Sequence, residues 1–251
     1  MVIIPNQGNR NSNDAIALAQ TMEGALDETT SMLQKIRTLA VQSSNGTNTA
    51  EDRKALQQEV TSLSNEINRI AEQTKFGGQQ VLASAGTGFI KDDATITFQV
   101  GANNGDEIIF TAISSGFTIS GIATVAGSLE LKDNAADAGA TGLLKIGTAA
   151  ARWSVSSADA AKKTLENIDA FIAAVDSKRA DLGAFQNRLE SSIRNQSNVS
   201  ANQADARSRI RDADFAEESA NLSQQSIIQQ AATSMLMQAN SRPQLALSML
   251  G

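Results

Sequence analysis

The sequence predicts a mainly α-helical protein: an elongated, antiparallel bundle of long, coiled-coil-like helices with a small β-hairpin in a β-rich middle segment. Two observations support this fold class. Apolar residues recur every three or four positions in both halves of the 251-residue chain, which is the pattern of a coiled-coil seam. Glycines gather between Gly86 and Gly147, whereas the only two prolines, Pro5 and Pro243, lie near the chain ends. Long uninterrupted helices are therefore expected on both sides of the middle segment.

The amino-terminal part is expected to form two antiparallel helices. The first has an apolar seam that includes Met22, Leu26, Leu33 and Ile36. Turn-forming residues 43–48 interrupt the pattern, and Thr49 is a candidate N-cap because acidic Glu51 and Asp52 follow it. A second seam then runs to the glycines at 77–78 through Leu56, Val60, Leu63 and Ile67. Because the connecting loop is short, the two helices should run antiparallel.

The carboxy-terminal part is expected to be one very long helix. Between about Ala158 and Asn240 there is no proline and a single glycine, so a continuous helix would be a rod of about 125 Å at 1.5 Å per residue. Its seam is formed by Leu165, Ile168, Ile172, Leu182 and Leu189. From Phe215 to Leu250 the apolar pattern is less regular, which indicates a looser or partner-dependent helix whose apolar positions include Phe215, Leu222, Ile227 and Met235.

The middle segment alternates polar and apolar residues over 95–100 and again over 108–112, with turn residues between, which predicts a β-hairpin. Residues 116–150 show no clear period and are expected to be weakly structured β and loop. These patterns predict four regions: 1–82 and 151–200 as the helical rod, 83–150 as the outward segment, and 201–251 as the terminal helix.

The composition excludes most enzyme chemistry. The chain has no His and no Cys, so it has no catalytic relay built on either residue and none of the usual zinc or haem ligand sets, and we expect no cofactor. A net charge of −6 argues against a nucleic-acid partner. The longest apolar runs fall short of the roughly 18 residues of a membrane span, so we expect no membrane insertion.

Several long motifs resemble bacterial flagellin. In the first half these are residues 10–16 (RNSNDAI), 21–26 (TMEGAL), 33–42 (LQKIRTLAVQ) and 45–48 (NGTN). In the second half they are residues 178–184 (KRADLGA), 186–190 (QNRLE) and 207–218 (RSRIRDADFAEE). The resemblance covers roughly residues 9–115 and 155–251, in the order of the family.

The resemblance implies a non-enzymatic subunit of the extracellular flagellar filament. Its helices would form the rod, other flagellin subunits would be its partners, and the chain would be exported unfolded through the flagellar secretion apparatus with the help of an export chaperone. Flagellins carry several dozen residues before the motif that begins at Arg10, whereas Met1 to Gln7 looks unrelated. The terminal helix would then lack its coiled-coil partner, and we expect no normal filament from the chain alone. The outer part is also short, reduced to about residues 116–150.

The resemblance further implies a surface recognised by the vertebrate Toll-like flagellin receptor. The corresponding residues are Gln34, Lys35, Leu39 and Glu59. Lys35 stands where the family has arginine, so it keeps the charge but lacks the guanidinium fork, which predicts weaker recognition. The same residues are also expected to contact neighbouring subunits.

The sequence also permits four alternative interpretations. A flagellin-like surface protein could bind a carbohydrate through residues 83–150, although the segment has few aromatics for a sugar platform. The acidic pairs Asp92–Asp93 and Asp106–Glu107 could act as glycosidase acids, but they are better explained as solvated turn residues. The acidic cluster at 212–218 could bind a metal, but it is better explained by ion pairs with the neighbouring arginines. A hook–filament junction protein would share the terminal helices.

Overall fold

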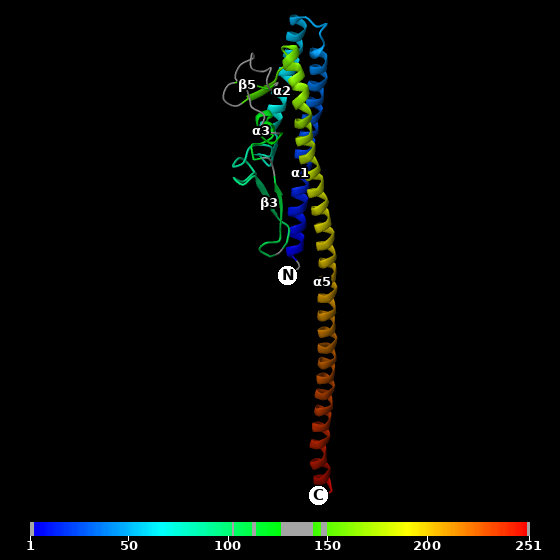
Figure 1. Ribbon diagram of the computed structural model, residues 1–251. Coiled ribbons are helices and arrows are strands. Elements are labelled where there is room, and N and C mark those ends of the chain that lie inside the picture. Colours follow the sequence, from blue (N-terminus) through cyan, green and yellow to red (C-terminus); the bar gives the residue numbers. More distant parts are fainter. Residues whose placement is uncertain (1–2, 102, 112–113, 127–142, 147–149, 250–251) are drawn as a thin grey trace. The chain divides into compact units, whose positions relative to one another are not determined.

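The computed structural model describes residues 3–101, 103–111, 114–126, 143–146 and 150–249, and these fall into two units, Ile3–Gln196 and Ser197–Gly251. Figure 1 shows the elements in chain order. They are α1 (Ile3–Ser44), α2 (Ala50–Gln73), β1 (Lys75–Phe76), β2 (Gln79–Gln80), β3 (Thr95–Gln99), β4 (Glu107–Thr111), α3 (Ile119–Val125), β5 (Leu143–Ile146), β6 (Ala150–Trp153) and α5 (Ala158–Ser248). The prediction of long helices with a small hairpin is confirmed.

The turn between α1 and α2 follows the predicted capping pattern. The Thr49 hydroxyl accepts a hydrogen bond from the Asp52 amide (3.3 Å), and the Asp52 carboxylate accepts one from the Thr49 amide (2.9 Å), which completes a capping box. Arg53 closes the turn by donating to the carbonyls of Ser43 and Asn45, both at 3.0 Å. These contacts join the two helices at a defined point.

In the first unit, α1 and the first part of α5 lie side by side and antiparallel (Figure 1). As the residue number rises along α1, the residue number of its contact on α5 falls. The contacts are Glu23 with Gln186 (2.9 Å), Asp27 with Arg179 (2.8 Å), Thr30 with Asp176 (3.4 Å) and Arg37 with Asp169 (2.8 Å). The side chains at the rim follow this register, while the apolar seam lies between the helices.

A single apolar cluster forms the interior of the first unit. The seam residues Met22, Leu26, Leu33, Ile36, Val60, Ile67, Ile168, Leu182 and Leu189 are buried, whereas Leu56, Leu63, Leu165 and Ile172 are only partly buried. The few aromatic side chains add local contacts: Trp153 stacks edge-on against Phe171, with ring centroids 4.6 Å apart, and Phe185 touches both Phe98 and Phe110 at 5.5 Å. The four seam residues named for α1 and three of the five named for α5 thus lie in the interior.

The buried face of α2 differs from the expected seam. Ser64 and Asn68 are buried between the apolar positions, because this side of α2 packs against β6 and α3 as well as α1. Three polar side chains of α2 bind the free edge of the β6 strand. Gln57 donates to Trp153 O (3.0 Å) and accepts from Val155 N (2.6 Å), Ser64 accepts from Trp153 N (3.3 Å), and Asn68 donates to Ala151 O (3.0 Å). This polar row takes the place of a third strand.

The middle segment contains the predicted hairpin and an element that the sequence did not indicate. β3 and β4 pair antiparallel from Thr95 opposite Thr111 to Gln99 opposite Glu107. β5 pairs antiparallel with β6, within a region expected to be weak β. A short helix, α3, also forms there. Thr118 caps it by accepting a hydrogen bond from the Gly121 amide, and Ile119 and Ile122 are buried. The rest of the expected loop, 127–142 and 147–149, lies outside the described residues.

One predicted helix end is corrected: α2 ends at Gln73 rather than at the glycines 77–78. Helix α1 begins at Ile3, and α5 runs without a break to Ser248. Phe76 instead joins the two-stranded β1–β2 hairpin, whose turn places Gly77 and Gly78 at positive φ. Among the described helices, none combines the length and the hydropathy needed to cross a membrane.

Candidate functional site

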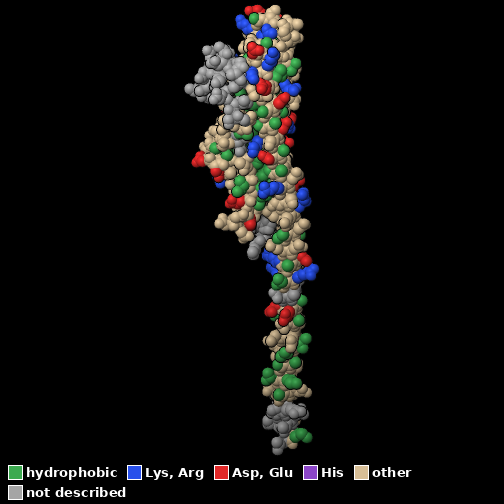
Figure 2. Space-filling view, viewed as in Figure 1, with side chains coloured by type: hydrophobic (Ala, Val, Ile, Leu, Met, Phe, Trp, Pro, Cys, Tyr) green, Lys and Arg blue, Asp and Glu red, His purple; other side chains and the backbone are tan. Residues whose placement is uncertain are grey.

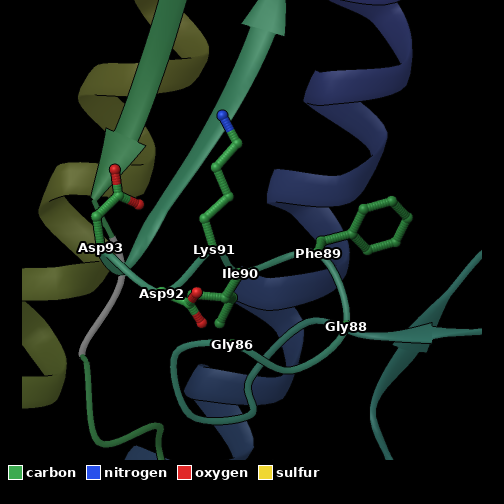
Figure 3. A pocket seen from close by; sticks show the side chains of 7 residues that line it. All are labelled: Gly86, Gly88, Phe89, Ile90, Lys91, Asp92 and Asp93. Atoms are coloured by element: carbon green, nitrogen blue, oxygen red, sulfur yellow. The ribbon is translucent and has the colours of Figure 1, made fainter.

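A shallow hollow of about 580 Å³ lies at the acidic pair that the sequence singled out (Figure 3). Its lining runs from Gly86 to Asp93, and Figure 3 shows the carboxyl groups of Asp92 and Asp93 pointing in different directions. Asp93 accepts hydrogen bonds from the amide (3.1 Å) and the hydroxyl (2.6 Å) of Thr95, and the hydroxyl bond is the main reason why its pKa is lowered. Asp93 is thus an ionised turn residue and is unsuited to act as a general acid.

The second acidic pair is also structural. Asp106 accepts hydrogen bonds from the amide (2.9 Å) and the side-chain amide (3.2 Å) of Asn103, which stabilises the turn between β3 and β4. In the part of the chain that the structure describes, no group of three or more acidic residues is placed to hold a metal ion. The side chains of Asp212 and Asp214, which belong to the third acidic cluster, lie outside that part.

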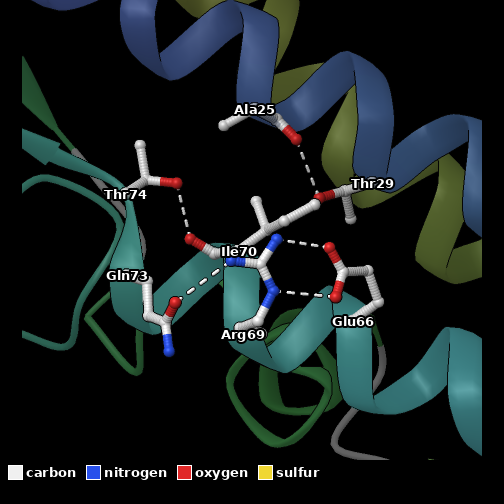
Figure 4. A network of polar contacts seen from close by, with 7 residues as sticks. All are labelled: Ala25, Thr29, Glu66, Arg69, Ile70, Gln73 and Thr74. Atoms are coloured by element: carbon white, nitrogen blue, oxygen red, sulfur yellow. Dashed lines mark hydrogen bonds and ion pairs between the residues drawn. The ribbon is translucent and has the colours of Figure 1, made fainter.

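A polar network on α2 is a surface feature rather than a reactive site (Figure 4). Arg69 donates both to Glu66 and to Gln73, the latter at 3.0 Å. The hydrogen bond from Arg69 lowers the pKa of Glu66, and the same bond raises the pKa of Arg69. Both side chains are about half exposed, so the pair contributes little to stability.

The residues of the expected receptor patch lie on α1 and α2 near their connecting turn. Gln34, Lys35 and Glu59 are exposed, and Leu39 is partly buried against the core. Because the helices reverse at residues 45–49, Lys35 and Glu59 lie at similar distances from the turn, 10 to 14 residues away on each side. At 1.5 Å per residue they occupy the same level of the helix pair within about one turn. Arg37 on the same helix is bound to Asp169, which leaves Lys35 as the free cation at this level of α1 among the described residues.

The terminal part of α5 exposes its large apolar side chains. The exposed fraction is 76% for Phe215, 65% for Leu222, 66% for Ile227, 73% for Met235, 62% for Leu236 and 70% for Met237. Residues 219–241 include no charged side chain, and Figure 2 shows green hydrophobic side chains along the described part of this segment. A soluble helix normally buries such residues, so this surface is the strongest candidate for a binding site in the described chain.

The exposed residues surround the helix rather than forming one stripe. Successive residues of an α-helix are about 100° apart, so Met235, Leu236 and Met237 together span about 200° of the circumference. Ile227 and Ile228 are likewise adjacent and both exposed. A single partner helix covers one seam of this surface. Full burial therefore requires more than one neighbour.

Two family models match the chain. The bacterial flagellin N-terminal helical region matches residues 5–87, and the bacterial flagellin C-terminal helical region matches residues 165–250. The first match corrects the expectation that Met1 to Gln7 is unrelated to the family, since it already includes residues 5–7.

Curated relatives agree with these models. The chain is 32% identical to flagellin D of Vibrio cholerae and 34% identical to flagellin D of Vibrio anguillarum, in each case over 96% of this chain and 83% of the relative. These alignments extend over 319 positions although the chain has 251 residues, so the relatives contain internal residues without a counterpart here.

Solved structures share the fold. A flagellin from Bacillus cereus superposes with a TM-score of 0.55 at 25% identity, over 74% of this chain and 88% of that chain. A flagellar hook-associated protein from Vibrio parahaemolyticus reaches a TM-score of 0.58 at 16% identity, over 80% of this chain and 92% of that chain, which reflects the fold alone. The two family matches and the curated relatives together establish that the chain belongs to the bacterial flagellin family, whose members are structural proteins and not enzymes.

Proposed function

We propose that the chain is a subunit of an extracellular bacterial flagellar filament and that the terminal part of α5 is its main assembly surface. The observation that carries the proposal is the exposure of large apolar residues around the whole helix at 215–237. A polymer surrounds each subunit with several copies of itself and can cover such a helix from several sides at once. A lone ligand or an intramolecular partner would cover only one seam.

The first unit supplies the complementary property, a stable rod. Its seam is buried, and side-chain pairs such as Asp27 with Arg179 and Arg37 with Asp169 follow a single register between α1 and α5. A defined register between α1 and α5 gives every copy the same outer surface. Identical surfaces are what a helical homopolymer requires, because each interface repeats along the filament.

A substitution in the exposed segment tests this proposal. The change Leu236→Lys keeps the helix propensity but removes an apolar contact of about 1.5–3 kcal/mol, which corresponds to a roughly 10- to 100-fold higher critical concentration for assembly. The matched control is Leu236→Met, which keeps an apolar side chain at the same position.

Assembly is measured by sedimentation and electron microscopy on the full-length protein. We expect filaments from the parent and from the methionine variant but not from the lysine variant at the same concentration. The proposal fails if the parent remains monomeric or if the lysine variant assembles as readily as the methionine variant.

The free subunit would need protection before assembly. Exposed apolar residues such as Phe215 and Leu222 favour aggregation in an unassembled chain. An export chaperone that binds residues 215–249 would cover them, consistent with unfolded export through the flagellar secretion apparatus. Co-elution of the chain with such a chaperone in gel filtration, and its loss in Leu222→Lys, would support this partner.

Recognition by the vertebrate Toll-like flagellin receptor is a second proposed function. It is favoured by the position of Gln34, Lys35 and Glu59, all exposed on neighbouring helices at one level. The variant Lys35→Arg restores a planar guanidinium that can bind a carboxylate through two hydrogen bonds, so receptor activation in reporter cells should increase. Lys54→Arg, an exposed lysine of α2 outside the patch, is the matched control. Equal activation by both variants would count against the patch.

The carbohydrate-binding alternative receives little support. Trp153, the aromatic residue that it would use first, has an exposed fraction of 0% and packs against Phe171. Phe117 and Phe110 are also buried, which leaves Phe89 as the exposed aromatic residue of the described middle segment. A glycan-binding measurement on the whole chain would decide between the two functions.

A further inference from the structure

The turn of the β3–β4 hairpin meets both long helices of the first unit at one point. The carbonyl of Val100 lies over Gly8 of α1 and accepts a hydrogen bond from the side-chain amide of Gln196 on α5. The neighbouring carbonyl of Gln99 accepts a hydrogen bond from Asn11 at 2.9 Å. Two successive carbonyls of the hairpin are therefore bound by the two helices.

Glycine is required at position 8 by the close approach of the hairpin. A Cβ atom built there would lie closer to the Val100 carbonyl oxygen than the 3.0 Å that real Cβ atoms keep, and 2.6 Å from the side-chain oxygen of Gln196. The Val100 carbonyl belongs to the backbone and cannot rotate away as a side chain could. Gly24 of the same helix has no neighbouring atom within 4 Å of its Cβ position and so faces no such requirement.

The hairpin turn is braced so that it presents this carbonyl rigidly. The amides of Val100 and Gly101 both donate to Asp106 O, at 2.9 Å and 3.1 Å. The side chain of Gln99 spans the turn and donates to the carbonyls of Gly101 (2.9 Å) and Asn103 (2.7 Å). A displacement of the turn would therefore move the Val100 carbonyl with it.

Gln196 is the last residue of the first unit. The contact thus lies at the end of the section of α5 that packs against α1, and α5 continues from there into the second unit. We propose that Gly8, Val100 and Gln196 form a conformational lock that makes the position of the hairpin and the order of α5 up to residue 196 depend on each other. A partner that displaces the hairpin would thereby loosen the end of this packed section. The inference concerns the free chain and does not rest on the proposed filament function.

Hydrogen exchange of the free chain, followed by mass spectrometry, tests the lock. In Gly8→Ala we expect exchange to accelerate about tenfold or more together in residues 3–12, 96–101 and 190–196, because local opening exposes all three segments as one unit. Gly24→Ala makes the same change in helix propensity on the same helix and should leave these three segments as in the parent chain.

A second variant avoids the added bulk. Gln196→Ala removes the donor to Val100, and we expect the amides of residues 96–101 and 3–12 to exchange faster although neither segment is altered. The lock is refuted if Gln196→Ala accelerates exchange only around residue 196, or if Gly8→Ala accelerates the hairpin and leaves 190–196 unchanged. Unfolding of Gly8→Ala would leave the Gln196→Ala result to decide.

Discussion

Replacing Asn68 by alanine is expected to weaken the attachment of the middle segment to α2. Asn68 is 7% exposed, donates to Ala151 O and accepts from the backbone amide of Ile119, each at 3.0 Å. It thus connects α2 to β6 and to the start of α3 through one side chain. Alanine would leave both backbone groups buried without a partner.

The size of the effect follows from these two groups. An unsatisfied buried donor or acceptor costs about 1–3 kcal/mol, so the two groups together cost about 2–6 kcal/mol. Alanine has a better helix propensity than asparagine, which offsets roughly 0.5 kcal/mol. Asn65→Ala gains the same propensity at an exposed position of the same helix and should change the free energy of unfolding by less than about 0.5 kcal/mol in either direction.

Urea unfolding followed by tryptophan fluorescence measures the difference. The chain has one tryptophan, Trp153, which is fully buried in the first unit. Its backbone carbonyl accepts a hydrogen bond from Gln57, and its backbone amide donates one to Ser64. With a slope of roughly 2–3 kcal/mol per molar urea, the midpoint for Asn68→Ala should fall by about 1–2 M while the slope stays the same.

Equal midpoints for the two alanine variants would contradict the expected role of Asn68. Equality would mean that water or local rearrangement satisfies Ala151 and Ile119 at no cost, so the polar row would not anchor the strand. A changed slope would instead indicate that the unfolding transition no longer involves the same surface.

Three further predictions concern other parts of the first unit. The hydrogen bonds from Thr49 lower the pKa of Asp52 below its usual value. The capping box therefore stabilises α2 fully above the ordinary carboxyl pKa and loses this effect as the pH falls through the lowered pKa. Asp52→Asn should remove this pH dependence from amide exchange in α2, and an unchanged pH profile would contradict the prediction. Gly88→Ala should lower the free energy of unfolding in urea by more than about 2 kcal/mol, because Gly88 has a φ of +63° and a Cβ atom there would collide with Gln80 O. Gly46 has open space at its Cβ position, so Gly46→Ala should leave the free energy of unfolding nearly unchanged. Equal effects of the two variants would show that the turn at Gly88 adapts. Asp169→Asn should change stability by less than about 1 kcal/mol, since its pair with Arg37 is more than half exposed, and a larger loss on thermal unfolding would show that the pair orders the helix register.

Local sequence signals predicted the helices and the hairpin because those signals act over a few residues. The heptad spacing of α1 and α5 requires only that every third or fourth side chain be apolar, and the alternation at 95–99 and 107–111 requires only period two. The cap at Thr49 is likewise contained within four residues. Each of these elements formed where the pattern placed it, within a few residues at the ends.

The features that the sequence did not predict depend on contacts with backbone groups far away along the chain. Gln57 and Asn68 appear in the sequence as ordinary polar residues of an amphipathic helix, and nothing nearby shows that they bind the edge of a strand some 80 to 100 positions later. The short helix α3 was missed because its buried side chains are few and because it packs against the distant elements β6 and α2. The glycine at position 8 has no local reason, since its neighbour is the hairpin turn at Val100.

The sequence alone determined the family, the helical periodicity and the absence of histidine or cysteine chemistry, because these are properties of residue identity and spacing. The tertiary structure decided which polar side chains are buried and which apolar residues remain uncovered, because burial depends on what the rest of the chain can bring into contact. In α2, a strand edge turned polar positions into interior ones. In residues 215–237, the absence of a covering segment among the described residues left apolar positions exposed.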